Sequence, residues 1–273
     1  MSYEQKKNLS VNSKEKGDFY DNSFAVIIGI NEYTKSPPLE YAVNDAKSIK
    51  ELLVNKFGFK DENIRLLIDS EATKESIRIA LNSVARLAKN NDRVLIYFSG
   101  HGQTITSVES NNMKIGYLIP VNGDLKDPVL NSIAMDEILL LCQSECKHML
   151  FLMDACYSGL MAKAKGLEIF EDNDDYIHSK ANISARQIIT AGSAEQISWE
   201  SGKIQHGIFT LTVLNALNNW EADNYYEDGY ITATELGEYL KKAVFDESDG
   251  TQTPQAERIR RSKRGEFIFT RNP

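Results

Sequence analysis

Short apolar runs that alternate with amphipathic segments constrain this chain more than any other feature of its sequence. Six runs rich in Val, Ile, Leu and Phe have the length of strands, at 24–30, 64–68, 93–98, 148–153, 186–191 and 266–270. Segments between them carry apolar residues at helical spacing, at 39–56, 73–88, 135–141, 208–217 and 232–244. The first run, FAVIIGI, lacks polar alternation, as is typical of a strand buried on both faces. The pattern predicts an α/β domain in which helices cover both faces of a mostly parallel sheet.

The 273 residues fit one large domain, because a chain of this length can bury a core without disulfides or a structural metal. Residues 1–22 are charged and lack the apolar run of a signal peptide, so we expect a mobile leader ahead of a domain at 23–273. The stretch 161–185 is irregular, and loops of this length in a compact domain tend to be functional.

Composition excludes several classes of protein. Hydrophobic residues make up 42% and charged residues 26%, which excludes collagen, low-complexity disorder and a small disulfide scaffold. The net charge of −8 gives no basic footprint, so we expect no nucleic-acid partner. The apolar runs are shorter than the roughly 20 residues of a membrane span, so we expect no membrane insertion. Three cysteines form no disulfide framework and favour a cytoplasmic location.

Two of the expected strands end in residues that can do chemistry. The run at 93–98 continues into Ser99-Gly100-His101-Gly102, and the run at 148–153 continues into Asp154-Ala155-Cys156. Ligands of open α/β sheets bind beyond the carboxyl ends of the strands. If these strands are neighbours, the imidazole of His101 can activate the thiol of Cys156, and the backbone N–H groups of Gly102 and Cys156 can face an oxyanion. Spacing alone leaves the alternatives open: a buried cysteine that serves as a small hydrophobe, and a loop histidine.

Together the two motifs resemble the His and Cys motifs of caspase-like cysteine peptidases. They are most similar to those of metacaspases and their bacterial relatives, the orthocaspases, and the resemblance extends from about residue 24 to the C-terminus. It implies a six-stranded, mostly parallel sheet sandwiched between helices. It also implies a cysteine endopeptidase without a cofactor, in which His101 is the general base or acid and Cys156 the nucleophile.

The resemblance further implies cleavage after Arg or Lys. Metacaspases bind the P1 cation with an Asp two residues before the nucleophile and an Asp in an N-D-A segment, which match Asp154 and Asp45. In the segment that resembles the caspase Ser-Trp-Arg strand, Glu200 stands where caspases carry a cation. Such a pocket would bind a guanidinium group and repel an Asp side chain. The expected S1 and S2 residues are Asp45, Ser99, Asp154, Ser193, Trp199 and Glu200. The structural alternatives are a first-turn helix carboxylate for Asp45 and a loop cap for Asp154.

The chain departs from the metacaspase pattern at several positions. Tyr157 follows the nucleophile where His is usual. Of the places that correspond to calcium ligands, only Asp136 is acidic, whereas calcium requires six to eight oxygens. We therefore expect calcium independence and no metal. The segment 224–229 with Glu235 resembles an EF-hand loop but lacks two carboxylates, which favours a polar turn that opens the helix at 232–244.

The irregular stretch at 161–185 directly follows the nucleophile, where caspase-like enzymes carry a linker that is often cut during maturation. Basic residues suited to self-cleavage are Lys163, Lys165, Lys180 and Arg186. An uncut surface loop is the alternative.

Two rival functions remain at this point. One is a catalytically silent caspase-like module that acts as a regulatory binding or scaffold protein, a reading that Tyr157 and the missing calcium ligands allow. The other, a phosphate-binding α/β protein, is disfavoured because no G-x-G-x-x-G or Walker sequence follows the first strand. The expected partners are a protein or peptide substrate with a basic P1 residue and, by analogy with bacterial relatives, an activating protein of a stress or defence system.

Overall fold

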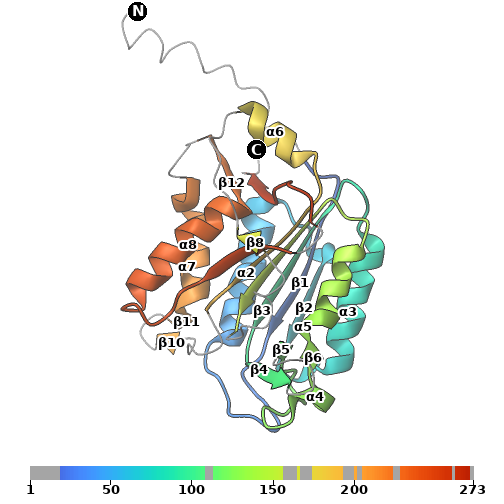
Figure 1. Ribbon diagram of the computed structural model, residues 1–273, viewed down its shortest axis with the longest axis vertical. Coiled ribbons are helices and arrows are strands. Elements are labelled where there is room, and N and C mark those ends of the chain that lie inside the picture. Colours follow the sequence, from blue (N-terminus) through green and yellow to red (C-terminus); the bar gives the residue numbers. More distant parts are fainter. Residues whose placement is uncertain are drawn as a thin grey trace, which may run out of the picture.

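The computed structural model describes residues 19–107, 113–155, 165–166, 174–192, 200–201, 205–223, 228–259 and 262–270. Its centre is a sheet that lies between two layers of helices (Figure 1). The strands follow the order β2-β1-β3-β7-β9-β13-β8 across the sheet. Their bounds, in that order, are Ile64–Ile68, Ser23–Gly29, Arg93–Ser99, His148–Asp154, Ala185–Thr190, Gln255–Arg258 and Lys165–Gly166.

The strands from β2 to β9 are parallel, and β13 is antiparallel to β9. The expected six-stranded, mostly parallel sheet is therefore confirmed, with the two-residue β8 added at its edge. The sixth strand was wrongly assigned, however. The run at 266–270 yields β14 (Ile268–Thr270), which pairs with β12 (Tyr230–Thr232) outside the main sheet. Strand β13 has the sequence QAER and half-buried side chains, so it gives no apolar signal.

Side chains alternate between the two faces of the sheet and form two cores. In β1, Val26 and Ile28 pack on one face, whereas Ala25 and Ile27 pack on the other. The first core is covered by α3 (Lys74–Leu87) and α5 (Met135–Leu139), and the second by α2 (Ala42–Phe57), α7 (Ile208–Asn218) and α8 (Ala233–Glu247). Figure 1 shows these two layers on opposite sides of the sheet. The same alternation decides which face receives each polar residue at the strand ends.

The helix boundaries follow local capping chemistry. Thr73 accepts a hydrogen bond from the backbone N–H of Ser76 and caps α3, while Gly58 ends α2 in the left-handed conformation, with φ of 69°. Thr232 and Glu235 form a capping box at the start of α8. Glu235 thus has a structural role as part of this cap, whereas residues 224–227 of the expected polar turn lie outside the described residues.

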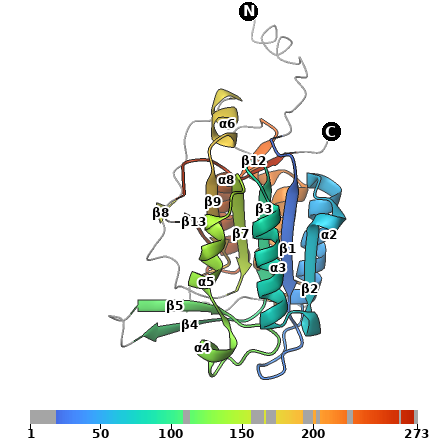
Figure 2. The same ribbon diagram turned by 90° about the vertical axis from the view of Figure 1, so that its right-hand side faces the viewer.

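A hairpin missed by the sequence pattern follows β3. Strands β4 (Gly102–Ser107) and β5 (Met113–Leu118) pair antiparallel, and β6 (Ile133–Ala134) joins them. In Figure 2 the β4–β5 hairpin extends to one side below the main sheet. Its first strand, GQTITS, consists mainly of small polar residues, which explains why the stretch reads as irregular.

The folded domain begins before residue 23, so the expected leader is too long. Phe19 and Tyr20 are buried against α6 (Asp174–Ala181) and β14. The guanidinium of Arg93 lies 4.6 Å from the centre of the Tyr20 ring, and the ammonium of Lys147 donates to the carbonyl of Phe19. Residues 1–18 lie outside the described part of the chain.

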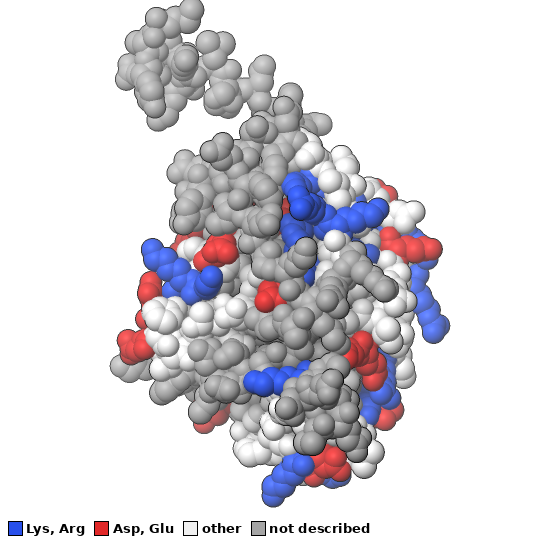
Figure 3. Space-filling model, in the orientation of Figure 1, with Lys and Arg blue, Asp and Glu red and all other residues white. Residues whose placement is uncertain are grey.

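The described surface mixes charges of both signs. On the face shown in Figure 3, acidic side chains lie beside the basic ones around the molecule. No helix in the described ranges is both long enough and apolar enough to cross a membrane.

Candidate active site

The two motif-bearing strands are neighbours and end at the same edge of the sheet. Ser99, the last residue of β3, is paired in register with Asp154, the last residue of β7. The backbone N–H of Gly100 lies 3.4 Å from the carbonyl oxygen of Asp154. The condition on which the sequence argument rested is therefore confirmed: the segment that carries His101 lies beside the segment that leads to Cys156. Cys156 itself lies outside the described residues.

The loop between β1 and α2 holds His101 in a defined orientation. Its Nε2 is 2.8 Å from the carbonyl oxygen of Pro37. A carbonyl only accepts, so Nε2 carries the proton in the neutral ring and Nδ1 carries the lone pair. The ring of Tyr33 packs against the imidazole with centroids 4.7 Å apart. This arrangement gives His101 a basic nitrogen, as a general base requires.

Tyr33 also holds the backbone of the His101 segment. Its hydroxyl oxygen accepts a hydrogen bond from the N–H of His101 at 2.7 Å. A Cβ at Gly100 would lie 2.5 Å from that oxygen, so only glycine allows this approach. Burial raises the pKa of Tyr33, and the hydroxyl therefore stays protonated at neutral pH.

We expect Tyr33→Phe to lower kcat about three- to tenfold with little change in KM. The variant keeps the packed ring but removes the acceptor that fixes His101, and one such hydrogen bond contributes about 0.5–1.5 kcal/mol. Steady-state kinetics on a P1-Arg peptide would measure this, with Tyr239→Phe on the remote helix α8 as the matched control. A change confined to KM would contradict a role in placing the histidine.

Asp45 enters the site from the first turn of α2. Its carboxylate is only 2% exposed and accepts from Nδ1 of His206 at 2.6 Å and from the N–H of Gly207 at 3.3 Å. The hydroxyl of Ser99 lies 3.4 Å away. A Cβ at Gly29 would collide with the carbonyl of Ala42, so this glycine allows α2 to begin close to the sheet.

Asp154 enters the same site from β7. It is 5% exposed, and its Oδ2 accepts from the hydroxyl of Thr210 at 2.6 Å. The hydroxyl of Tyr97 lies 2.6 Å from that of Thr210. Since Thr210 donates to the carboxylate, it accepts from Tyr97. Burial, and next the carboxylates of Asp45 and Asp154, raise the pKa of Tyr97, which therefore stays a donor.

The two carboxylates flank the same point in space. A Cβ at Gly207 would lie 3.0 Å from Oδ2 of Asp154 and 3.3 Å from Oδ2 of Asp45. Two buried carboxylates so placed repel each other, and a cation between them would relieve this repulsion. The structure thus brings Asp45, Ser99 and Asp154 together in one acidic cluster next to the His101 segment.

Other residues of this acidic cluster were missed by the sequence analysis. His206, Thr210 and Tyr97 show no periodic signal of their own; the only hint was a His-Gly pair just before an apolar helix. Strand β10 (Glu200–Ser201) pairs with β11 (His206–Gly207), with Glu200 opposite Gly207. The backbone of Glu200 therefore lies beside Gly207.

Arg186 is contradicted as a self-cleavage site. It lies within β9, 8% exposed, and its backbone is part of the central sheet. Its guanidinium donates to the carbonyls of Cys142, Ser144, Cys146, Lys147 and Ala185. A strand so enclosed cannot enter a protease cleft, and the residue serves the core instead.

The remaining candidates are scattered. Lys180 lies in the last turn of α6, and the backbone of Lys165 lies in β8, paired with Arg258. Gly102 begins β4. Lys163, Ser193 and Trp199 lie outside the described residues.

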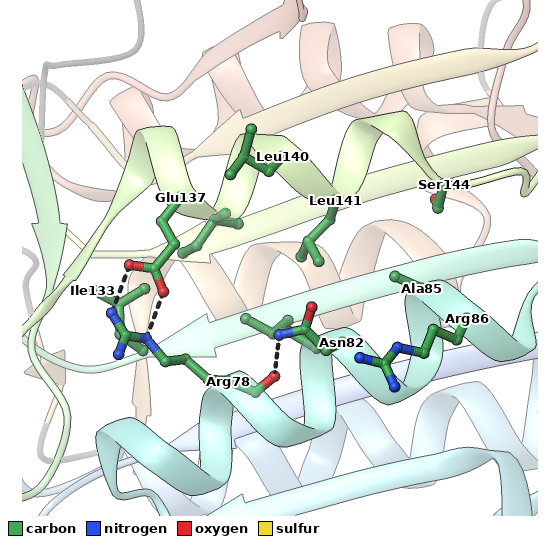
Figure 4. Close-up of a pocket in the computed structure, with 11 residues that line it drawn as sticks. Arg78, Asn82, Ala85, Arg86, Ile133, Glu137, Leu140, Leu141 and Ser144 are labelled. Atoms are coloured by element: carbon green, nitrogen blue, oxygen red, sulfur yellow. Dashed lines mark hydrogen bonds and ion pairs between the residues drawn. The ribbon is translucent and has the colours of Figure 1, made fainter.

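No metal cluster is evident in the described ranges. No three His, Cys, Asp or Glu side chains there are grouped so as to hold a metal ion. A separate hollow of about 380 Å³ lies between α3 and α5 (Figure 4). Arg78 and Glu137 close one part of it with a two-bond ion pair of 2.5 and 2.8 Å. None of the predicted site residues lines this hollow, which lies over the first core, between α3 and α5.

Comparisons with known proteins agree with this architecture. A sequence model of the family described as Caspase domain matches residues 22–264. The chain is 28% identical over 146 residues to Metacaspase-1 of Eremothecium gossypii, an alignment that covers 50% of this chain and 32% of that protein. It is 30% identical over 180 residues to Metacaspase-4 of Arabidopsis thaliana, with 60% and 42% covered. The chain thus spans less than half the length of these relatives.

Among solved structures, protein GSU0716 from Geobacter sulfurreducens is similar with a TM-score of 0.60. The match covers 89% of this chain and 95% of that one at 17% identity, and so it concerns the fold.

Proposed function

This chain belongs to the Caspase domain family, and from that premise we propose that it is a cysteine endopeptidase that cleaves after Arg or Lys. Cys156 is the nucleophile and His101 its partner. The observation that carries the specificity is the pair of buried carboxylates, Asp45 and Asp154, on either side of the space next to Gly207.

Each step of the reaction has a residue assigned to it. Nδ1 of His101 takes the proton of the Cys156 thiol, and the sulfur attacks the scissile carbonyl carbon. The backbone N–H groups of Gly102 and Cys156 stabilise the oxyanion. The intermediate collapses to a thioester as the leaving amine takes the proton from His101. Water, deprotonated by the same imidazole, then hydrolyses the thioester and restores the thiol.

The P1 side chain enters the acidic pocket. Its guanidinium or ammonium lies between Asp45 and Asp154, and Ser99 and Glu200 complete the S1 lining. Charge-assisted hydrogen bonds of this kind are about twice as strong as neutral ones, and the same carboxylates exclude an acidic P1 residue. Ser193 and Trp199 remain candidates for S1 and S2.

The proposal also includes calcium independence, a cytoplasmic location and self-processing after Lys163, Lys165 or Lys180. The loss of acidic residues at the metacaspase calcium positions supports the first. Two of the three cysteines, Cys142 and Cys146, are free thiols, which suits a reducing compartment.

The test compares wild type, Cys156→Ala and the control Cys142→Ala on fluorogenic peptides with Arg, Lys, Asp or Leu at P1. We expect turnover of the Arg and Lys peptides only, lost in Cys156→Ala, kept in Cys142→Ala, and equal in calcium and in chelator. Turnover of the Asp peptide would overturn the pocket assignment. No turnover, together with an unreactive Cys156 thiol, would instead favour the silent regulatory module.

A further inference from the structure

Exposed apolar side chains gather on one face of the molecule. Six large hydrophobic residues are exposed in the described ranges, and five of them lie on α3, on α4 (Pro128–Asn131) and on the short helix η4 (Leu140–Gln143) that continues α5. These five are Ile79, Leu87, Val129, Leu130 and Leu140. Figure 2 shows α3 and α5 side by side on the face toward the viewer, with α4 below them. Single exposed apolar residues are normal, but a group of them on one face marks an interaction surface.

The hollow between α3 and α5 belongs to this face. Its volume is about 380 Å³, and the core residues Leu81, Ile138 and Leu141 form its floor. In Figure 4, Leu140 and Leu141 lie on one wall and Ala85 on the other. Leu140 borders the hollow and is nevertheless 61% exposed. An apolar side chain that entered here would therefore contact both the core and a residue that is now largely in water.

Arg86 gives this face a surplus of positive charge. The charge of Arg78 is offset by its two-bond ion pair with Glu137. Among the residues that the structure describes, none forms a hydrogen bond or an ion pair with the exposed guanidinium of Arg86. Arg86 lines the hollow and also a second one of about 540 Å³ on the outer side of α3, which Ile79 and Leu87 border. A partner that complements this face therefore carries a carboxylate opposite Arg86.

The walls of the hollow favour a helix as the occupant. One wall is α3, and the other is α5 with η4 (Figure 4). Residues within a helix use their backbone groups for their own hydrogen bonds, so an extended peptide would find few backbone partners along these walls. A bound helix satisfies its own backbone, and side chains three or four residues apart can enter a groove of this kind.

A second copy of the chain would complement this face less well. In a two-fold pair the same surface of both copies meets. Each copy would then bring the same surplus of positive charge, carried by Arg86, to one interface. The charge on this face thus favours a different protein as the partner.

We propose that the groove between α3 and η4 is a docking site for an amphipathic helix of a partner protein, which places apolar side chains in the hollow and a carboxylate at Arg86. The groove is separate from the acidic cluster, because its walls cover the first core, whereas Asp45 lies on α2, over the second. The inference therefore does not depend on the proposed cleavage specificity.

The test begins with a displayed library of helical peptides, selected for binding to the full chain. The probes are synthetic, fluorescein-labelled peptides of the enriched sequences, and fluorescence anisotropy gives their Kd. We expect these peptides to share apolar residues at i, i+4 and i+7 and to carry Asp or Glu beside them.

Two substitutions locate the binding site. We expect Leu140→Ser and Arg86→Glu each to weaken binding of the enriched peptides about tenfold. The matched controls are Phe245→Ser, at an exposed apolar residue of α8, and Arg65→Glu, at an exposed arginine of β2, and both should bind as wild type does. A peptide whose acidic residues are replaced by Lys should bind Arg86→Glu more tightly than it binds wild type.

The remaining outcomes would each overturn the proposal. Either no peptide is enriched, or the enriched peptides have the same Kd for wild type, Leu140→Ser and Arg86→Glu. Peptides without an acidic residue, unaffected by Arg86→Glu, would refute the stated chemistry of the partner. An equal loss in Phe245→Ser would indicate unspecific apolar binding. A wild type that sediments as a dimer, and becomes a monomer in Leu140→Ser, would show that a second copy covers this face.

Discussion

Replacing Asp154 with asparagine is expected to lower kcat/KM for a P1-Arg peptide by about two to three orders of magnitude. The carboxylate is buried, and loss of one partner from a buried charge pair typically costs 2–5 kcal/mol. Asparagine keeps the shape, and its carbonyl oxygen can still accept from the hydroxyl of Thr210. The fold should therefore persist, while the site loses one of the two carboxylates that are proposed to bind the P1 cation.

Kinetics on the Arg and Lys peptides would measure the effect. The matched control is Asp61→Asn, the same substitution at a carboxylate that is exposed and bound to Lys50 on the surface. We expect the control to behave as wild type. A drop of less than fivefold in Asp154→Asn, with the thermal midpoint unchanged, would mean that the P1 cation does not bind at this carboxylate.

His148 should make the protein sensitive to acid. It lies at the start of β7, and burial lowers its pKa from 6.5 to about 3. Its Nε2 donates to the carbonyl of Ile183 at 2.9 Å, so its Nδ1 accepts from the hydroxyl of Tyr20 at 2.7 Å. That hydroxyl in turn accepts from the N–H of Ile268. An imidazolium could not accept the bond from Tyr20, and it would lie beside Lys147.

The two pKa values of His148 determine whether its contribution to stability rises or falls with pH. The unfolded chain binds a proton near pH 6.5 and the folded chain only near pH 3, so the unfolded state binds more protons between these values. The stabilisation is complete above pH 6.5 and is lost as the pH falls toward 3. A shift of this size corresponds to about 5 kcal/mol at the acid end.

Urea unfolding of wild type and His148→Gln at pH 7.5, 5.5 and 4.0 would test this. Other groups titrate as well, so the informative quantity is the difference between the two proteins in unfolding free energy. We expect that difference to change by about 3 kcal/mol between pH 7.5 and 4.0 in favour of the variant. His178→Gln, at an exposed histidine on α6, is the control. Parallel pH profiles of wild type and His148→Gln would refute the prediction.

Local chemistry explains the parts of the fold that could be predicted. The runs 94–98 and 149–153 are apolar because they are buried on both faces, and both lie in central strands. Strands β13 and β4 escaped prediction for the opposite reason. Strand β13 has half-buried side chains, most of them polar, and β4 consists mainly of small polar residues. Neither strand has an apolar periodicity, so both are defined by their pairing in the folded structure.

Some residues of the candidate site could be predicted from sequence motifs, and others could be found only in the structure. Asp45, Ser99, His101 and Asp154 lie within recognisable motifs, and their strands or helices carry them to one edge of the sheet. His206 and Thr210 come from the other half of the chain, and only the packing of α7 against α2 and β7 reveals them. Arg186 shows the opposite error, because a basic residue near a loop looks cleavable until its strand is seen in the sheet.

The order of strands in the sheet decides what a cut after β7 would do. Strand β9, on the far side of any such cut, remains paired with β7 along its whole length, from His148 with Ala185 to Met153 with Thr190. Helix α7 still packs on α2, and His206 still bonds to Asp45. A nicked protein would therefore run as two bands on a denaturing gel but elute as one particle of unchanged size. The acidic cluster of Asp45 and Asp154, which we propose as the P1 site, would then be joined to His206 of a second polypeptide.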